Sequence, residues 1–302
     1  MDKLYDNLIE LVGKENIEKD ADMKNHTTFR AGGKAEFLVT PVDIESTCRL
    51  YKYLYDNNIK YYFIGNGSNL LVRDEGFDGV IVKFGNNFSD IETDGEEIKC
   101  GAGCYLSKVA NVAKENSLKG MEFAAGIPGF IGGAIAMNAG AYGGEMKDIV
   151  KEVVVINKNG DIKNIPGAEM DFSYRHSKVL DEKYIVISVI LSLKKGNKDE
   201  IIEEMDGLQK ARKDKQPLEY PSAGSTFKRP EGYFAGKLIE DSGLRGYSVG
   251  DACVSEKHCG FVVNKGNASA TDIINLIKHV QDKVYKDSGV VLEPEVKILW
   301  DL

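Results

Sequence analysis

The sequence predicts a fold in which strands and helices alternate, for three reasons. Runs of β-branched and aromatic residues, such as residues 35–40, 80–84 and 184–193, are typical of buried strands. Apolar residues at helical spacing recur elsewhere, as in residues 271–286. Glycine and asparagine turns separate the two kinds of segment. We therefore expect the first part of the chain to be rich in strands, with helices interleaved.

The elements expected in the first part begin with a helix, because residues 4–12 place their leucines on one helical face. A second helix begins after Asp43, a favoured capping residue. Asp94-Gly95 and Asn159-Gly160 are strong hairpin signals. We expect strands at residues 35–40, 61–64, 80–84, 91–93, 97–100, 149–157, 161–165 and 184–193, and a helix at 107–116 capped by Ser107.

The composition changes at the basic run of residues 194–198, which we take as a domain boundary. Beyond it, Ser269 is a favoured N-cap for an amphipathic helix. We expect helices at residues 199–213, 236–242 and 271–286, strands at 252–255, 261–264 and 290–299, and a polar loop at 216–230.

Residues 124–144 (AAGIPGFIGGAIAMNAGAYGG) are uncharged and consist mostly of glycine and alanine. So little side chain cannot fill a core, and glycine is costly inside a helix or strand. The stretch favours an exposed main chain on which a large flat ligand can lie. Gly126 to Gly129 is typical of a tight turn, and residues 134–139 of a short helix. The alternative is a packing seam between two close elements.

A second glycine loop, Gly65-Asn66-Gly67-Ser68-Asn69, follows the strand expected at residues 61–64. Successive backbone N–H groups in such a turn can form an anion nest, and Ser68 and Asn69 add side-chain donors. The alternative is an ordinary hairpin turn. Together the two loops indicate a large phosphate-bearing cofactor that is held from two sides.

The common nucleotide signatures do not fit this sequence. Leu106 occupies the third glycine position of a G-x-G-x-x-G pattern that begins at Gly101. Residues 232–238 have neither the spacing nor the hydroxyl of a P-loop. The cofactor loops therefore belong to another architecture.

The chain has 302 residues, and 42% of them are hydrophobic. Its net charge of −8 lacks the excess of positive charge that nucleic-acid-binding proteins have. Its N-terminus is acidic and amphipathic, and no uncharged apolar run is long enough to span a membrane. We expect no signal peptide and no membrane insertion. The five cysteines have neither disulfide-framework nor zinc spacing. We therefore expect no metal, reduced thiols and a cytoplasmic location.

Five motifs occur in order along the chain: GNGSNLLV, AAGIPGFIGGAIAMNAGAYG, FSYRHS, PSAGSTFKRP and LEPEVKIL. Together they resemble the UDP-N-acetylenolpyruvylglucosamine reductases, flavoenzymes of bacterial peptidoglycan precursor synthesis. The resemblance extends from about residue 25 to residue 299, which is nearly the whole chain.

The resemblance implies an α+β protein: a two-subdomain FAD-binding fold of the vanillyl-alcohol-oxidase/PCMH type, followed by a smaller α+β substrate-binding domain. We assign residues 1–22 to a lead-in helix, 23–195 to the FAD-binding domain with its subdomains split near residue 85, and 196–302 to the substrate-binding domain. The implied cofactor is a tight, non-covalent FAD, with NADPH as co-substrate. The implied reaction reduces UDP-N-acetylglucosamine enolpyruvate to UDP-N-acetylmuramate, and we expect the enzyme to be a monomer.

The resemblance also implies roles for individual residues. Arg175 and Glu295 would stabilise negative charge that develops on the substrate, and Ser225 would donate the proton. Tyr174, Arg212 and Lys215 would bind the nucleotide-sugar substrate, with Lys215 at its diphosphate. The cofactor-binding residues would be Gly65, Asn66, Gly67, Ser68, Asn69, Gly126, Ile127, Pro128, Gly129, Gly132, Gly133 and Asn138.

Other functions stay open at this stage. A flavin oxidase of the same fold, acting on a sugar or an alcohol, would consume oxygen. A non-catalytic nucleotide-sugar-binding protein would purify without colour. The single residues also have ordinary structural interpretations. Arg175 could be a surface arginine, Ser225 a loop serine and Glu295 a strand residue on a solvated face. Arg212 and Lys215 could be cations at a helix C-terminus.

The sequence departs from the family pattern at two positions. Family members often have glycine where Asp251 stands and asparagine where Gly260 stands. One branch of the family also carries an additional tyrosine-bearing loop. The present chain has no matching insertion and therefore resembles the branch without that loop.

Overall fold

The computed structural model describes residues 2–299, so residue 1 and residues 300–302 of the expected terminal segments lie outside the described part. This part divides into two compact units. The first contains the chain up to Lys19, Phe37–Asn66 and Gly79–Arg212. The second contains Asp20–Glu36, Gly67–Asp78 and the chain from Lys213 onward. Each unit is thus assembled from distant segments, and the domain boundaries expected from the sequence stay predictions.

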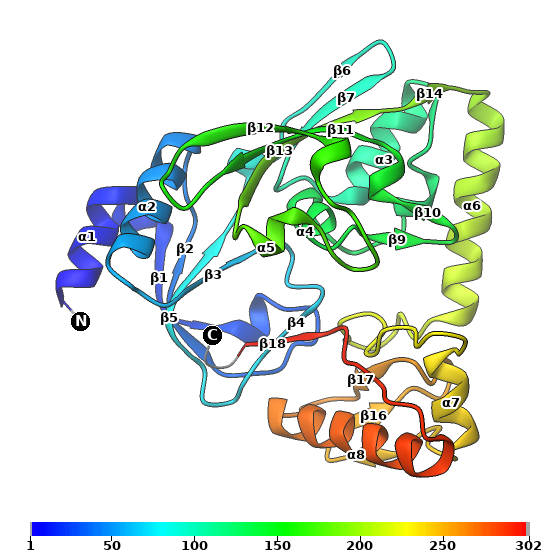
Figure 1. Ribbon diagram of the computed structural model, residues 1–302. Coiled ribbons are helices and arrows are strands. Elements are labelled where there is room, and N and C mark those ends of the chain that lie inside the picture. The colour runs from blue at the N-terminus through cyan, green and yellow to red at the C-terminus, as the bar shows by residue number, and fades with distance from the viewer. Residues whose placement is uncertain (1, 300–302) are drawn as a thin grey trace. The chain divides into compact units, whose positions relative to one another are not determined.

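An antiparallel sheet of order β12-β11-β13-β7-β6 provides much of the core of the first unit (Figure 1). The two hairpins predicted from Asp94-Gly95 and Asn159-Gly160 are both present. In the second, Asn157 Oδ1 accepts backbone N–H groups of Asn159 and Asp161 and so closes the turn. The strands are β6 (Ile91–Asp94), β7 (Glu97–Gly101), β11 (Val150–Ile156), β12 (Ile162–Pro166) and β13 (Ile185–Ser192).

A further sheet has the order β1-β2-β5-β3, with β3 and β5 parallel. Helices α1 (Asp2–Val12) and α2 (Ile44–Asp56) pack together, and Leu8 and Leu50 lie in a shared apolar core. Asp43 caps α2, as predicted, in a capping box with Ser46. Strand β1 was not predicted because its sequence, IEKDAD, has no apolar alternation. The strands are β1 (Ile17–Asp22), β2 (Lys34–Val39), β3 (Tyr61–Ile64) and β5 (Phe77–Lys83).

The starts of two helices differ from the prediction. Helix α3 (Leu106–Glu115) begins after Tyr105 rather than at Ser107, because the Leu106 N–H donates to the carbonyl of Gly129. Helix α4 (Ile131–Ala136) begins before residue 134, because the Ile131 N–H donates to the carbonyl of Cys104. Both helix starts are therefore fixed by long-range backbone contacts that a local pattern does not contain. Helix α4 packs against β13 and β7.

The remaining elements of the first unit are short, except for helix α6 (Lys198–Lys215). This helix was predicted at residues 199–213, and its last residues lie in the second unit. The short elements are β8 (Leu118–Lys119) paired with β14 (Lys194–Lys195), β9 (Gly140–Ala141) paired with β10 (Gly144–Glu145), and α5 (Lys178–Asp181).

In the second unit, helix α8 (Ala270–Ser288) covers a small sheet of order β15-β16-β17. Its apolar face is buried, and Ser269 caps it as predicted. The Asp74 carboxylate accepts the N–H groups of Ala270 and Thr271 and so ties the start of α8 to the end of β4. The other elements are α7 (Ala235–Asp241), β15 (Ser248–Val249), β16 (Ala252–Val254), β17 (Val262–Asn264) and the parallel pair β4 (Leu70–Val72) and β18 (Lys297–Leu299).

The strand predicted at residues 290–299 is wrong over most of its length, since only β18 is regular. Pro294 has no N–H to donate to a ladder. It forms instead an isolated antiparallel bridge with Phe227. This irregular segment carries Glu295.

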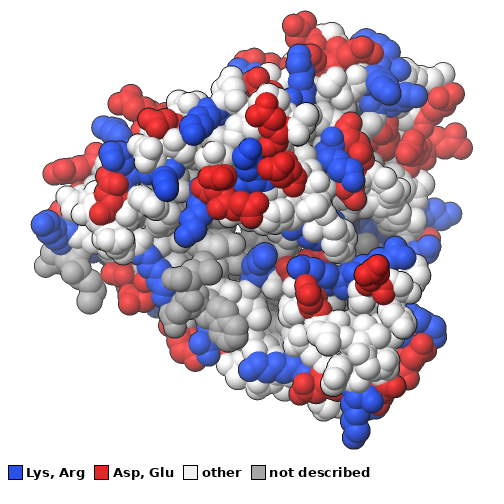
Figure 2. Space-filling view, viewed as in Figure 1, with Lys and Arg blue, Asp and Glu red and all other residues white. Residues whose placement is uncertain are grey.

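Charged side chains of both signs mix over the face of the molecule in Figure 2. Interspersed charges of this kind are typical of an ordinary solvated surface.

Candidate functional site

The two glycine loops lie side by side in the first unit, although Asn66 and Pro128 are 62 residues apart. The Asn66 Nδ2 group donates to the carbonyl of Pro128 at 2.8 Å. Phe130 packs onto Gly65 so closely that a Cβ added there would lie 3.1 Å from the Cβ of Phe130. A side chain at position 65 would therefore press against Phe130 of the second loop.

The rest of the first glycine loop, Gly67 to Asn69, belongs to the second unit. Gly67 has φ +64°, and an added Cβ would lie 2.1 Å from the carbonyl oxygen of His26. The Thr28 N–H donates to the carbonyl of Gly67. The polar loop around residues 25–33 therefore holds this half of the glycine loop in its conformation.

The glycines of the long stretch serve two purposes. A Cβ on Gly132 would lie 3.0 Å from the Cβ of Ala102, so the packing-seam interpretation holds at that position. A Cβ on Gly133 would meet nothing within 4 Å, so the main chain there faces open space. A large planar cofactor fits such a bare main-chain surface. The turn lies one residue earlier than predicted, at residues 125–126, where the Ile127 N–H donates to the carbonyl of Ala124, and Ile127, Pro128 and Gly129 follow it as irregular chain.

Asn138 lies at the end of this stretch and is only 1% exposed. Its Nδ2 group donates to Glu145 Oε2 at 2.9 Å and to the carbonyl of Ser173 at 3.1 Å. Its Oδ1 atom accepts the N–H of Lys147 at 2.9 Å. The Asn138 amide is thus engaged within the protein on both its nitrogen and its oxygen.

Tyr174 and Arg175 form the tip of a tight turn in the first unit. Ser173 and His176 exchange two backbone hydrogen bonds, of 3.1 and 3.2 Å, at the base of the turn. Arg175 has φ +57°, a region that non-glycine residues rarely adopt and that is found at functional sites. Its Cζ atom lies 4.9 Å from the centre of the Tyr174 ring. The turn therefore presents an aromatic ring and a guanidinium together.

Ser225 and Glu295 are brought together in the second unit. The Glu295 N–H donates to the carbonyl of Thr226, and the Lys228 N–H donates to the carbonyl of Glu293, both at 2.8 Å. Gly224 has φ +76° and turns the chain so that Ser225 is exposed while Thr226 is buried. The predicted proton donor and the predicted catalytic carboxylate therefore lie on adjacent, paired segments.

Two residues support this pair that sequence reasoning did not assign to it. The Thr226 Oγ1 atom accepts the N–H of Val262 at 2.8 Å, which joins the Ser225 segment to β17. The Asn69 Nδ2 group donates to the carbonyl of Glu295 at 3.1 Å. Neither contact leaves a signal in the sequence, because each joins segments far apart in the chain. Glu293 is exposed and forms an ion pair with Lys228 at 3.0 Å.

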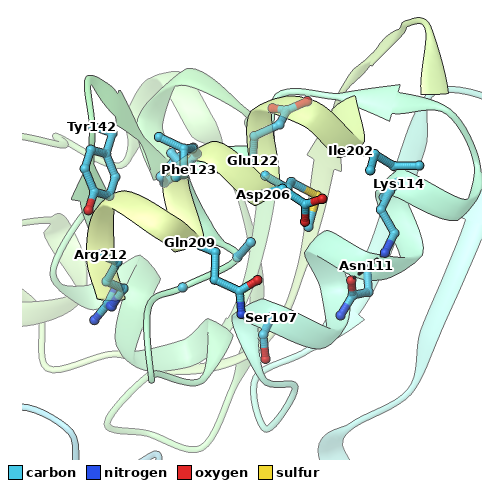
Figure 3. A pocket seen from close by; sticks show the side chains of 14 residues that line it. Ser107, Asn111, Lys114, Glu122, Phe123, Tyr142, Ile202, Asp206, Gln209 and Arg212 are labelled. Carbon is cyan, nitrogen blue, oxygen red and sulfur yellow. Dashed lines mark hydrogen bonds between the residues drawn. The ribbon is translucent and has the colours of Figure 1, made fainter. Parts of the chain in front are cut away.

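A cavity of about 240 Å³ lies in the first unit between α3, α6 and the short helix η4 (Glu122–Ala124) (Figure 3). Tyr142 and Arg212 lie toward one end of the view, and Lys114 and Asn111 toward the other. Arg212 also lies against the glycine turn, since a Cβ on Gly126 would be 3.0 Å from its Cδ.

The Arg212 guanidinium is half-buried, and burial lowers its pKa from the ordinary value. Among residues 2–299, no carboxylate forms an ion pair with it. A desolvated cation without a counter-charge is well suited to bind an anionic group of a ligand. Lys215, the last residue of α6, is exposed.

The two departures from the family pattern have local structural partners. The Asp251 Oδ2 atom accepts the N–H of Asn267 at 2.8 Å. The Gly260 N–H donates to His258 Nδ1 at 3.1 Å, and a Cβ on Gly260 would lie 2.9 Å from His258 Cε1. Burial lowers the pKa of His258. Glycine at position 260 thus leaves room for the His258 ring.

All five cysteines are free thiols. Within the described part of the chain, no group of three or more His, Cys, Asp or Glu side chains is arranged to hold a metal ion. A search of the same residues finds no helix with the length and apolarity to cross a membrane.

Comparison with protein families gives two matches. Residues 35–165 match the model of an FAD-binding domain, and residues 216–299 match the model of the C-terminal domain of UDP-N-acetylenolpyruvoylglucosamine reductase. A glucose dehydrogenase structure, Phl p 4.0202, matches 66% of this chain and 45% of its own at 15% identity with a TM-score of 0.52, which shows the fold alone. The predicted α+β FAD-binding fold is thereby confirmed.

Full-length relatives are similar over nearly the whole chain. The UDP-N-acetylenolpyruvoylglucosamine reductase of Clostridium tetani is 50% identical over 97% of this chain and 95% of its own length. That of Clostridioides difficile is 50% identical over 98% and 97%. The crystal structure of the Thermus caldophilus enzyme matches 93% of this chain and 98% of its own, at 36% identity and a TM-score of 0.82. By its sequence, fold and domain composition, this chain belongs to the UDP-N-acetylenolpyruvoylglucosamine reductase family.

Proposed function

We propose that this chain reduces the enolpyruvyl ether of UDP-N-acetylglucosamine to UDP-N-acetylmuramate, with tightly bound FAD as cofactor and NADPH as the hydride source. The observation that supports this most strongly is the backbone pairing of the Ser225 segment with the Glu295 segment, in which the Glu295 N–H donates to the carbonyl of Thr226. An exposed hydroxyl and a carboxyl group on adjacent segments suit protonation of a carbanion-like carbon. Chemistry of this kind belongs to peptidoglycan precursor synthesis.

Residues of both glycine loops would hold the FAD. Gly133 offers open main chain, and the bond between Asn66 and Pro128 keeps the two loops together. Ser68 and Asn69 supply polar groups in the other half of the first loop. We expect the bound cofactor to be tight and non-covalent.

FAD bound in this site would supply the hydride-transfer chemistry between NADPH and the methylene carbon of the enolpyruvyl double bond. Negative charge then develops on the adjacent carbon and its carboxylate. Arg175 stabilises this charge with its planar, permanently charged fork, and Glu295 stabilises the enolate by hydrogen bonding. Ser225 donates its proton to the carbon on which the negative charge develops, the one adjacent to the methylene carbon. This step completes the addition of a hydride and a proton across the double bond.

Tyr174, Arg212 and Lys215 would bind the substrate. The uncompensated charge of Arg212 supports a contact with an anionic group, and the exposed ammonium group of Lys215 suits a diphosphate. Since the chain lacks the tyrosine-bearing loop of the other family branch, these cations would supply the diphosphate contacts.

The experiment that tests this proposal separates the two half-reactions in Ser225→Ala. Reduction of the flavin by NADPH needs no proton from Ser225 and should proceed at its normal rate. Reoxidation by the enolpyruvyl substrate should slow about 10²–10⁴-fold, the usual effect of a positioned general acid. Anaerobic stopped-flow absorbance measures each half. Equal slowing of both half-reactions would show that Ser225 positions the cofactor. No slowing of either would show that another group donates the proton.

A flavin oxidase of the same fold is the weaker alternative, because its support is a likeness of fold at low identity. Oxygen consumption with a sugar or an alcohol would favour it. We further propose that the enzyme works as a monomer in the cytoplasm. The five free thiols support a reducing compartment. Sedimentation of the purified holoenzyme would test the monomer.

A further inference from the structure

We propose that Asn138 is a positioning residue that holds Arg175 in its catalytic conformation, rather than a side-chain ligand of the cofactor. The inference rests on the role proposed above for Arg175. It assigns a further residue to the reaction, in a segment that the sequence associates with the flavin.

The contacts of Asn138 lead directly to the Arg175 turn. Its Nδ2 group donates to the carbonyl of Ser173, which is the first residue of the turn, at 3.1 Å. Ser173 in turn exchanges both backbone hydrogen bonds with His176. On the far side of the turn, the buried Ser177 donates from Oγ to the carbonyl of Ala136 at 2.9 Å. Both ends of the turn are thus fixed to the C-terminal end of α4, one to its last residue Ala136 and the other to Asn138 just beyond it.

The turn needs this support because its tip is strained. Arg175 adopts φ +57°, a region that is unfavourable for a non-glycine residue. The tip is also exposed, with Tyr174 48% accessible, so little apolar burial offsets that cost. Hydrogen bonds at the base fix the backbone from which the Arg175 side chain projects.

Asn138 is suited to this task because every bond it makes is inside the protein. It also donates to Glu145 Oε2 and accepts the Lys147 N–H, so it joins three separate segments. Hydrogen bonds from Lys147 and Asn138 hold the pKa of Glu145 below its usual range, and the positive charge of Arg175 contributes to the same effect. At 1% exposure, the Asn138 side chain has no accessible face left for a ligand.

The test uses the FAD-loaded enzyme with Asn138→Ala. A displacement of about 1 Å at a catalytic group can cost about 10²-fold in rate. We therefore expect reoxidation of the flavin by the enolpyruvyl substrate to slow by about 10²-fold, with FAD content and reduction by NADPH little changed. Asn138→Asp is a second variant for the case in which the alanine variant does not fold. It keeps the shape but loses both donors and places a carboxylate beside Glu145.

A matched control is Asn157→Ala in the same unit. Asn157 is also buried, and its amide also makes three hydrogen bonds, to Asp161 and to two backbone N–H groups of its own turn. It lies in the hairpin between β11 and β12 and touches neither Ser173 nor Glu145. We expect it to lower the melting temperature without changing either half-reaction.

A double-mutant cycle with Arg175→Lys distinguishes positioning from general stability. If Asn138 acts through Arg175, the loss caused by Asn138→Ala should largely disappear in the Arg175→Lys background, because the guanidinium it positions is already gone. An equal loss in both backgrounds, or loss of FAD from Asn138→Ala, would overturn the inference. No effect of Arg175→Lys alone would instead refute the proposed role of Arg175.

Discussion

Replacement of Thr226 by valine tests how the paired segments of Ser225 and Glu295 are held. The Thr226 hydroxyl accepts the N–H of Val262 at 2.8 Å, and the residue is 0% exposed. Valine has nearly the same shape, so it would leave that N–H buried without an acceptor, which costs about 1–3 kcal/mol. Since the Thr226 carbonyl also accepts the N–H of Glu295, the change should loosen the catalytic pair as well.

Urea unfolding would measure the loss of stability of Thr226→Val, and stopped-flow absorbance would measure the two half-reactions. We expect the substrate half-reaction to slow more than the reduction by NADPH. Thr47→Val is a suitable control, since Thr47 is equally buried but serves α2 in the first unit. Unchanged stability, or equal slowing of both half-reactions, would refute the assignment of Thr226 as a support for this pair.

Three further predictions follow from the site. Arg175→Lys keeps the positive charge but loses the planar guanidinium, so turnover should fall greatly while the FAD content stays unchanged. Near-normal turnover would show that Arg175 is a surface residue without a catalytic role. Gly133→Val should reduce the FAD content of the protein. The control Gly207→Val, at a glycine of α6 that also faces open space, should not. A normal FAD content in both variants would show that Gly133 is not part of the cofactor site. Burial raises the pKa of Asp74, but hydrogen bonds from the start of α8 outweigh it and lower that pKa below the ordinary value. The stability contributed by Asp74 should therefore be complete at neutral pH and be lost below about pH 4, and urea unfolding of Asp74→Ala should show a smaller acid-induced loss than wild type.

The elements that could be predicted from the sequence are those with local causes. The capping box at Asp43, the Asn159-Gly160 turn and the Ser269 cap depend on residues within a few positions, and all three are present. The charge-rich strand β1 could not be predicted, because the sheet around it determines its conformation. The same holds for the start of α3, which a carbonyl of the glycine stretch fixes.

The site shows the same limit. Motifs single out Arg175, Ser225 and Glu295, because each motif is a short local pattern. Thr226 and Asn138 also lie within the motifs, but their hydrogen bonds join distant segments, so the motifs identify the residues without their partners. Pro294 differs from these residues, because its missing N–H can be read from the sequence and disfavours a central strand, and the segment is irregular there.

The most direct test of the proposed function is an anaerobic assay of the purified, FAD-containing protein with NADPH and UDP-N-acetylglucosamine enolpyruvate. We predict that NADPH oxidation depends on the sugar nucleotide and that mass spectrometry finds UDP-N-acetylmuramate, heavier than the substrate by a hydride and a proton. Protein that carries no FAD, or that oxidises NADPH at the same rate with and without the enolpyruvyl substrate, would contradict the account.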